Sequence, residues 1–330
     1  MKKFISSIPM LLYGVIFTFI AAVLSSALAE TAPFSAMGAL VIAILVGILW
    51  RTTAGIPERA LPGITFSSRF LLRLGIIFLG ARLHLGDIYD AGFNAFFIAA
   101  SGLLITLLFI YFAAAALRID KTLSLLTACG TAICGASAIA AIAPIVKAEQ
   151  KTTTASIAII ALIGTVFSVS YTLLFPFLGM NAYEYGILSG GTLHEIAHAV
   201  AASEAGGAVS ENNALVIKLT RVALLIPAAL VIALLHGRKE KESLRKLPVP
   251  WFIFGFLAMS LANTFHLLSA STAAFMVSAS YILLGMAMAG LGMQMPAAFF
   301  KTVNLKIFIV AVSGSLLLSF FGYFLIEVLL

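Results

Sequence analysis

Four ionisable side chains fall inside one of the most apolar parts of this sequence. The stretch Gly186–Gly207 is rich in glycine and alanine, yet it carries His194, Glu195, His198 and Glu204. Moving such groups from water into a bilayer is costly, so ionisable residues at membrane depth mark functional sites by default. The small neighbouring residues allow helices to approach closely, or to break, inside a membrane. This stretch is therefore our first candidate for a functional site.

Two kinds of chemistry fit these residues. The five residues from His194 to His198 match H-E-x-x-H, in which two histidines one helical turn apart bind zinc and the glutamate is a general base. Such a site needs a third ligand and no aspartate follows Asp120, so an intramembrane zinc metalloprotease is the alternative hypothesis. In the preferred interpretation, His194 and Glu195 titrate and couple transport to an ion gradient, without any metal, cofactor or catalytic residue. A cluster that only fixes helix packing, and a channel or receptor-like scaffold, stay open.

A second stretch, Cys129–Ala143, resembles Gly191–Glu204 but carries no charge. Its Gly-Thr opening and four of its alanines coincide with those of the charged stretch, in which Glu195 and His198 replace a cysteine and a serine. We expect both stretches to be broken helices that meet near the middle of the membrane. N-terminal ends of half-helices near Gly130–Thr131 and Gly191–Thr192 would offer free N–H groups to an anion. The candidate substrate-binding residues are Gly130, Thr131, Cys134, Ser137, Gly191, Thr192, His194 and Arg221.

Two cations follow the charged stretch directly. Lys218 and Arg221 lie within the apolar run Ala214–Ile226. They either extend to lipid headgroups from the last turn of a helix, or neutralise Glu195 or Glu204, or face an anionic substrate. The planar guanidinium of arginine can donate two hydrogen bonds to an oxyanion. We assign Arg221 to substrate binding, and Lys218 to coupling together with His194 and Glu195.

The composition indicates that these stretches belong to a membrane protein. Of 330 residues, 62% are hydrophobic and only 10% are charged, whereas soluble domains carry about 25% charged residues. We therefore expect one polytopic transmembrane domain over residues 1–330. The two cysteines, Cys129 and Cys134, do not suggest a disulfide framework. No phosphate-binding GxxxxGK[ST] motif occurs, so the sequence argues against ATP-driven transport, and the net charge of +7 does not indicate nucleic acid binding.

Eleven apolar segments predict an all-α protein with about eleven transmembrane helices: 8–28, 34–50, 70–86, 92–117, 122–146, 152–178, 184–205, 213–236, 250–267, 270–294 and 305–328. With the N-terminus in the cytoplasm and the C-terminus outside, fourteen lysines and arginines fall in cytoplasmic loops. Three, Arg82, Lys147 and Lys151, fall outside, in keeping with the positive-inside rule. Lys147 and Lys151 fit this topology poorly, because it places two lysines close together outside. A re-entrant fifth or seventh segment would change the number of transmembrane spans.

Internal similarity indicates inverted repeats. Leu74–Gly80 resembles Leu284–Gly290, and these belong to the third and tenth segments, which run in opposite directions across the membrane. The fifth and seventh segments hold the two Gly/Ala-rich stretches, but an even separation gives them the same direction. A broken or re-entrant element would resolve this conflict.

Several motifs together resemble the YeiH/YadS-type, UPF0324-like family, for which sulfate export has been suggested: Leu71–Gly86, the run from Cys129 to Ala141, Gly191-Thr-Leu-His-Glu195 and Lys218-Leu-Thr-Arg221. His198 departs from the pattern, because an amide-type residue is expected there. The central part also resembles the bile acid/sodium symporter-like superfamily, in the clan of cation–proton antiporters and anion transporters. That likeness implies broken helices that cross, and a second bundle that moves against them.

These observations predict a secondary transporter in a bacterial inner membrane rather than an enzyme. Its substrate would be a small anion, sulfate being the one that the family suggests, and the coupling ion would be a proton or sodium. The lipid bilayer is the expected surrounding, and no nucleic acid partner is expected. The substrate, the coupling ion, the direction of transport and the oligomeric state, including a homodimer, stay open at this point.

Overall fold

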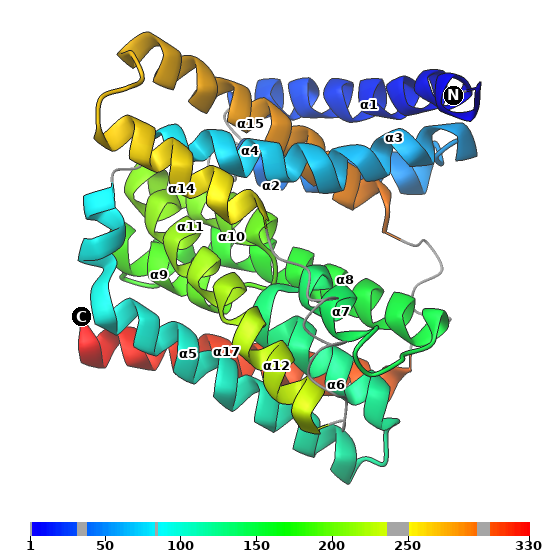
Figure 1. Cartoon of the computed structure of the whole chain (residues 1–330), viewed down its shortest axis with the longest axis vertical. Helices are drawn as coiled ribbons and strands as arrows, with labels where there is room; N and C mark the ends of the chain where they lie inside the picture. Colours follow the sequence, from blue (N-terminus) through cyan, green and yellow to red (C-terminus); the bar gives the residue numbers. More distant parts are fainter. Residues whose placement is uncertain (1, 32–37, 83–84, 236–250, 296–303) are drawn as a thin grey trace. The chain divides into compact units, whose positions relative to one another are not determined.

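The structure is a computed structural model that describes the chain except for residues 1, 32–37, 83–84, 236–250 and 296–303. Every regular element in the described residues is helical, which confirms the all-α prediction for them (Figure 1). Seven described stretches are long and apolar enough to cross a membrane: Met10–Ala29, Glu58–Arg82, Phe96–Ala116, Gln150–Phe177, Ile196–Leu235, Ala270–Met293 and Leu305–Leu329. Shorter apolar helices cover Ala39–Thr53, Lys121–Cys134 and Trp251–Thr264. The count of about eleven spans and the inverted repeats stay predictions.

The helices form two compact units that are each discontinuous along the chain. The first unit comprises Met1–Asp90 and Trp251–Ala297, and the second comprises Ala91–Pro250 and Ala298–Leu330. Every candidate site residue from the sequence lies in the second unit.

Close backbone contacts hold the first unit together. Glycines let two of its helices touch: a Cβ added at Gly47 would lie 2.3 Å from the carbonyl oxygen of Ala289, and one added at Gly292 would lie 2.2 Å from that of Ile44. Small residues at such contacts are typical of helix association in lipid. The helices of this unit are α1 (Lys2–Ala29), α2 (Ala39–Thr53), α3 (Leu61–Phe66), α4 (Leu72–Leu79), α14 (Trp251–Thr264) and α15 (Ala270–Met293).

The third apolar segment begins earlier than the sequence predicts. Helical residues run from Glu58 to Arg82, whereas we expected a span over 70–86, and Arg69 lies in this helical stretch rather than in a loop. The two similar segments, α4 and α15, pack against each other. A Cβ added at Gly75 would lie 3.0 Å from the side chain of Leu284.

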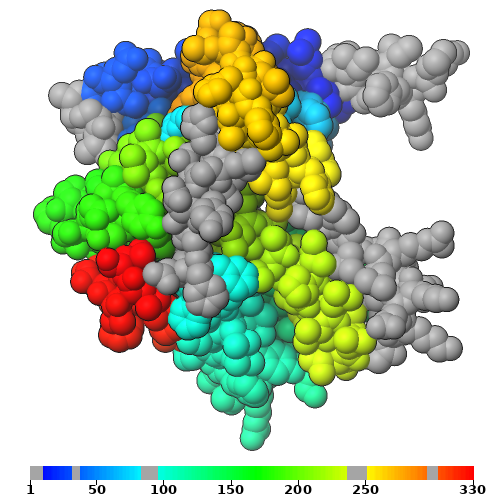
Figure 2. All heavy atoms as spheres, turned by 60° about the vertical axis from the view of Figure 1, so that its left-hand side comes forward, coloured from blue at the N-terminus to red at the C-terminus, as the bar shows by residue number. Residues whose placement is uncertain are grey.

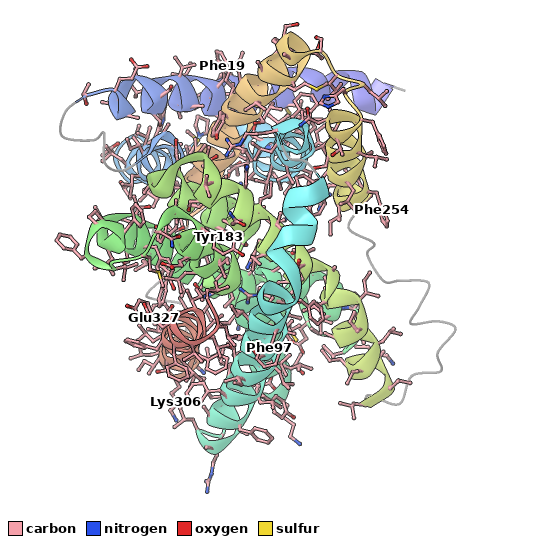
Figure 3. The ribbon with its side chains drawn as sticks, turned by 90° about the vertical axis from the view of Figure 1, so that its left-hand side faces the viewer. Phe19, Phe97, Tyr183, Phe254, Lys306 and Glu327 are labelled. Atoms are coloured by element: carbon pink, nitrogen blue, oxygen red, sulfur yellow. The ribbon has the colours of Figure 1, made fainter. Side chains whose placement is uncertain are left out.

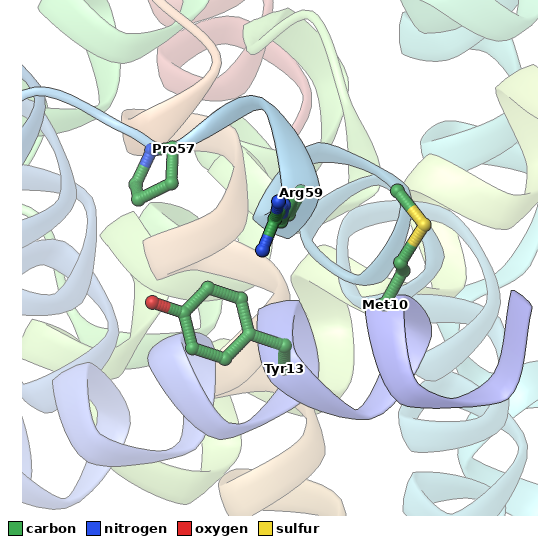
Figure 4. Close-up of a pocket in the computed structure, with 4 residues that line it drawn as sticks. All are labelled: Met10, Tyr13, Pro57 and Arg59. Atoms are coloured by element: carbon green, nitrogen blue, oxygen red, sulfur yellow. The ribbon is translucent and has the colours of Figure 1, made fainter.

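A pocket lies beside α1 in the first unit. Met10, Tyr13, Pro57 and Arg59 line it (Figure 4). None of these residues belongs to the motifs that suggest chemistry in the sequence. The functional site must therefore be sought in the second unit.

The second unit contains the two Gly/Ala-rich stretches and the helices around them. Polar side chains fix where two of its helices begin: Asp120 accepts a hydrogen bond from the Leu123 N–H (2.9 Å), and Asn181 forms a reciprocal capping box with Glu184. The elements of this unit are α5 (Leu85–Ala116, from Ala91 onward), α6 (Lys121–Cys129), η4 (Gly130–Cys134), α7 (Ala136–Ile142), α8 (Gln150–Leu174), η5 (Phe175–Phe177), α9 (Ala182–Thr192), α10 (Ile196–Ser203), η6 (Glu204–Gly206), α11 (Gly207–Ala223), α12 (Leu225–Leu235) and α17 (Leu305–Leu329).

The charged stretch folds back on itself as a helical hairpin, here called the charged hairpin (α9 and α10). The Tyr185 hydroxyl, near the start of α9, donates a hydrogen bond to the carbonyl oxygen of Ala202, near the end of α10 (3.1 Å). In a straight helix, these two residues would be roughly 25 Å apart along the axis. A Cβ added at Gly206, just after α10, would lie 3.0 Å from the Tyr185 ring. Both ends of this element therefore lie together.

The neutral stretch also folds back, and it is called the neutral hairpin (α6, η4 and α7). Its helix stops at Gly135, whose φ of +66° interrupts the helical backbone. A Cβ added at Gly130 would lie 2.8 Å from the Cδ1 atom of Ile139, which is possible only if α7 turns back toward η4. The expected interruption is thus present in both stretches. We expected helices that cross, but each one reverses at its break, and the two meet at their tips.

Helix α8 shows that the hairpins point toward each other. Ile160 contacts the neutral hairpin at Gly130, and Thr165, five residues later, contacts His198 of the charged hairpin. Phe175, directly after α8, packs against Tyr185 at the base of that hairpin. The hairpins therefore occupy successive lengths of α8. Their tips lie near the middle of this helix. The base of the charged hairpin lies at its C-terminal end, and only residues 143–149 separate α7 of the neutral hairpin from the start of α8.

Apolar side chains cover the outside of both units, as expected for helices in contact with lipid. Phe19 and Phe254 of the first unit, and Phe97 on α5 of the second, are among the large exposed residues that point outward (Figure 3). Within the second unit, α17 lies beside α5 in both the ribbon and the space-filling view (Figure 2). Gly314 of α17 makes room there for the side chain of Ile110.

Candidate functional site

The candidate site is the junction where the tips of the two hairpins meet. Leu193 and Glu195 have extended backbones, so α10 cannot begin before Ile196. The Ala136 N–H, just past the break of the neutral hairpin, donates a hydrogen bond to Glu195 Oε1 (3.1 Å). Only glycine fits at position 135, because φ is positive there and a Cβ would lie 2.3 Å from Glu195 Cγ. The Glu195 carboxylate thus joins one tip to the other.

Lys218 on α11 also bridges the two tips. Its side chain is 0% exposed, and its ammonium donates hydrogen bonds to the carbonyl oxygens of Ile133 (3.3 Å) and Leu193. These oxygens follow the last hydrogen-bonded turns of the first half-helices. The last carbonyls of a helix lack intrahelical donors, so a buried helix end requires donors from elsewhere.

Arg221, one turn further along α11, supplies more of these donors. Its Nη1 donates to the carbonyl oxygens of Gly191 (2.6 Å) and Leu193 (3.2 Å), and its Nη2 donates to those of Thr131 (3.3 Å) and Ala132. The guanidinium is 0% exposed and therefore lies entirely within protein. Its five N–H donors in a fixed fork suit a site where carbonyls converge from two sides.

These contacts correct two expectations about the junction. Lys218 and Arg221 do not extend to lipid headgroups, because both are fully buried and donate to backbone carbonyls. The prediction of half-helix N-termini near Gly130–Thr131 and Gly191–Thr192 is wrong. The breaks come after these residues, at Gly135 and Leu193, so the Gly-Thr pairs lie in the last turns of the first half-helices, and the carbonyl oxygens of Thr131 and Gly191 accept hydrogen bonds from Arg221.

The H-E-x-x-H residues do not form the helical motif that a zinc site would need. His194 precedes α10, and its Nε2 is 2.8 Å from the Ser315 hydroxyl on α17. His198 lies on α10, and its Nε2 is 3.3 Å from the Thr165 hydroxyl on α8. Among the residues that the structure describes, no group of three or more His, Cys, Asp or Glu could hold a metal ion. The helical premise of the protease alternative is therefore wrong.

Other candidate residues lie around the junction with different exposures. Thr192 is buried, and its hydroxyl is 2.7 Å from that of Tyr171. Cys134 is buried and Ser137 is exposed, and the Ser137 hydroxyl donates to both the carbonyl oxygen and the sulfur of Cys134 (2.8 Å each). Ser137 is the one exposed residue among those predicted to bind substrate. Glu204 lies at the base of the charged hairpin, away from the tips.

Sequence reasoning missed three hydroxyl residues of this site. Tyr171 on α8 donates a hydrogen bond to Ser319 on α17 (2.8 Å), and Ser315 on α17 lies beside His194. The only signal in the sequence is that these polar residues interrupt apolar helices. Polar groups at such positions require partners in lipid, but hydropathy does not tell which partners they have.

The junction gathers more positive than negative side chains. Lys218 and Arg221 carry two positive charges when both are protonated, and Glu195, which is 9% exposed, carries one negative charge when ionised. The partial negative charge at the C-terminal ends of the two first half-helices stabilises the cations. Unpaired buried charge is nevertheless costly, so this arrangement favours a further anion at the junction.

Comparisons with known proteins place this sequence among membrane proteins. Residues 13–311 match the family described as conserved hypothetical protein 698. A UPF0324 membrane protein of Oceanobacillus iheyensis is 48% identical over 322 residues, which cover 96% of this chain and 95% of that protein. A UPF0324 membrane protein of Staphylococcus aureus is 39% identical over 316 residues, which cover 95% of this chain and 96% of that protein. No solved structure matches.

Proposed function

This chain belongs to the UPF0324 membrane protein family, the same group as the YeiH/YadS-type proteins, and we propose that it is a secondary transporter of a small anion. The observation that carries the proposal is the hairpin junction, where two buried basic side chains and one carboxylate each contact the hairpin tips. Irregular backbone at membrane depth is tolerated only where protein buries it or where it lines a cavity. Broken helices that meet inside the membrane are a common form of substrate site in secondary transporters.

The anion would bind beside Glu195 and Ser137. Ser137 is exposed at the edge of the junction, so an anion would enter the junction from the protein surface at this residue. The Ser137 hydroxyl can rotate from the Cys134 sulfur to an oxyanion. Sulfate is the first substrate to test, because an excess of positive charge favours an anion. Lys218 and Arg221 would act mainly through their charge, since both already donate to carbonyls.

Glu195 would couple transport to protons. Protonation removes its negative charge, which leaves the positive charges of Lys218 and Arg221 uncompensated at the junction. An anion would then bind more tightly, and by linkage a bound anion would favour the protonated carboxyl group. Proton and anion would therefore move in the same direction.

The hairpins also suggest a revised membrane topology. If the neutral hairpin is re-entrant, Lys147 and Lys151 lie on the same side as Arg118 and Lys121, in the cytoplasm. The charged hairpin would then enter from the outside, and nine segments would cross the membrane. Of the three cations first assigned to the outside, only Arg82 stays there, so the positive-inside rule is better satisfied. The two hairpins become an inverted pair, which removes the conflict of direction, and the termini keep their predicted sides.

Uptake by reconstituted protein tests the proposed function. Purified protein in liposomes should accumulate radiolabelled sulfate when the outside is made acidic, because entering protons would drive the anion inward. A protonophore should abolish the accumulation, and liposomes without protein give the background. Chloride, nitrate and acetate extend the test to other small anions. If none of these anions exceeds the background under any pH gradient, the proposal is wrong.

A further inference from the structure

Lys218 has surroundings that resemble those of a bound metal cation. Its ammonium lies between the carbonyl oxygens of Ile133 and Leu193, one from each hairpin. In many secondary transporters, unwound backbone carbonyls and the C-terminal ends of half-helices coordinate a sodium ion at such a place. Here a side chain brings its own positive charge to these oxygens.

The neighbouring contacts leave the Ile133 carbonyl, but not the Leu193 carbonyl, to Lys218 alone. Arg221 donates to the oxygens of Gly191, Thr131 and Ala132, and it shares that of Leu193. Of the Lys218 acceptors, the Ile133 oxygen receives no hydrogen bond from Arg221 in the structure. Without the ammonium, two helix ends would keep their partial negative charge and lose a cation that stabilises it.

We propose that the Lys218 ammonium is a tethered cation that fills a monovalent-cation position between the hairpin tips. The wild-type protein then binds no sodium at this position, and removal of the ammonium opens the position to a free cation. A consequence for transport is that uptake does not depend on sodium. This consequence rests on the proposed function, whereas the cation position itself does not.

Thermal unfolding of purified variants in detergent tests the cation position without any transport assay. In choline chloride, Lys218→Ala should lower Tm by roughly 5–10 °C, because buried carbonyls lose their donor. Sodium chloride, or n-propylammonium chloride, which supplies the atoms that the substitution removes, should restore most of the lost Tm. The wild-type Tm should be the same in all three salts. Lys151→Ala, at an exposed position on α8, is the matched control and should behave like the wild type.

A more conservative substitution at Lys218 keeps the test valid if Lys218→Ala does not fold. Lys218→Ser keeps one donor and leaves a similar space, so it should show a smaller loss of Tm and the same recovery. The proposal is wrong if sodium raises the wild-type Tm relative to choline, or if neither cation raises the Tm of the variants. It is also wrong if neither variant can be purified in sodium.

Uptake measurements separate this inference from the proposed function. Wild-type uptake should be equal in sodium and in choline media, and a requirement for sodium would overturn the inference. If no anion is transported in either medium, the proposed function fails, while the Tm measurements still decide whether Lys218 occupies a cation position.

Discussion

Glu195→Gln is expected to lose pH-gradient-driven sulfate uptake completely while the protein still folds and inserts. Glutamine keeps the shape and the oxygen that accepts from the Ala136 N–H, so Tm should change by only a few degrees. It cannot bind and release the coupling proton. Uptake driven by an acidic exterior should therefore fall to the background of protein-free liposomes, although exchange of labelled for unlabelled anion can persist.

Glu204→Gln is the matched control for this experiment. Glu204 follows α10 at the base of the same hairpin, so it lies in the same element without being at the junction. Its substitution should leave the dependence on the pH gradient intact. If Glu195→Gln instead transports sulfate with unchanged dependence on the gradient, Glu195 is not the coupling group. Its role would then be limited to holding the two tips together.

Arg221→Met should cause the largest loss of stability. The substitution keeps much of the apolar side chain but removes donors to four backbone carbonyls at two buried helix ends. The Leu193 oxygen keeps the hydrogen bond from Lys218, so three acceptors lose their side-chain donor. An unsatisfied buried acceptor costs about 1–3 kcal/mol, so the total is on the order of 3 kcal/mol or more. We expect Tm in detergent to fall by about 10 °C or more, with loss of a single peak in size-exclusion chromatography.

Two further variants show whether this loss belongs to the junction. Arg221→Lys, with fewer donors and no planar fork, should recover only part of the stability. Arg118→Met, at an exposed position between α5 and α6, should leave Tm unchanged. A wild-type Tm for Arg221→Met would mean that the guanidinium does not hold the hairpins together.

The sequence predicts the all-α fold class better than it predicts which apolar segments cross the membrane. Hydropathy finds each apolar segment, but a hairpin of two short half-helices contains about as many apolar residues as one full span. The break at Gly135 is marked by a glycine, whereas the break at Leu193 and Glu195 contains neither glycine nor proline. For this reason, the sequence alone cannot distinguish a re-entrant seventh segment from one that crosses the membrane.

The sequence identifies the charged residues of the site but not their hydrogen-bond partners. The charges of Glu195, Lys218 and Arg221 stand out in an apolar sequence, and the structure brings these three residues to one junction. Their partners could not be predicted, because the acceptors are backbone carbonyls that become free only where a helix ends. The H-E-x-x-H motif is misleading because it assumes a continuous helix, and the extended backbone at Glu195 interrupts that helix.

In the proposed topology, the two hairpins enter the membrane from opposite sides and meet at their tips. Lys147 follows the neutral hairpin and Phe177 precedes the charged one, and both are exposed. A membrane-impermeant maleimide should label Lys147→Cys only from the cytoplasmic side, in inverted vesicles, and Phe177→Cys only from the outside, in intact cells. Arg118→Cys, which both the eleven-span and the nine-span topologies place in the cytoplasm, is the control. Labelling of Lys147→Cys from the outside and of Phe177→Cys from the cytoplasm would mean that both segments cross the membrane and that neither hairpin is re-entrant.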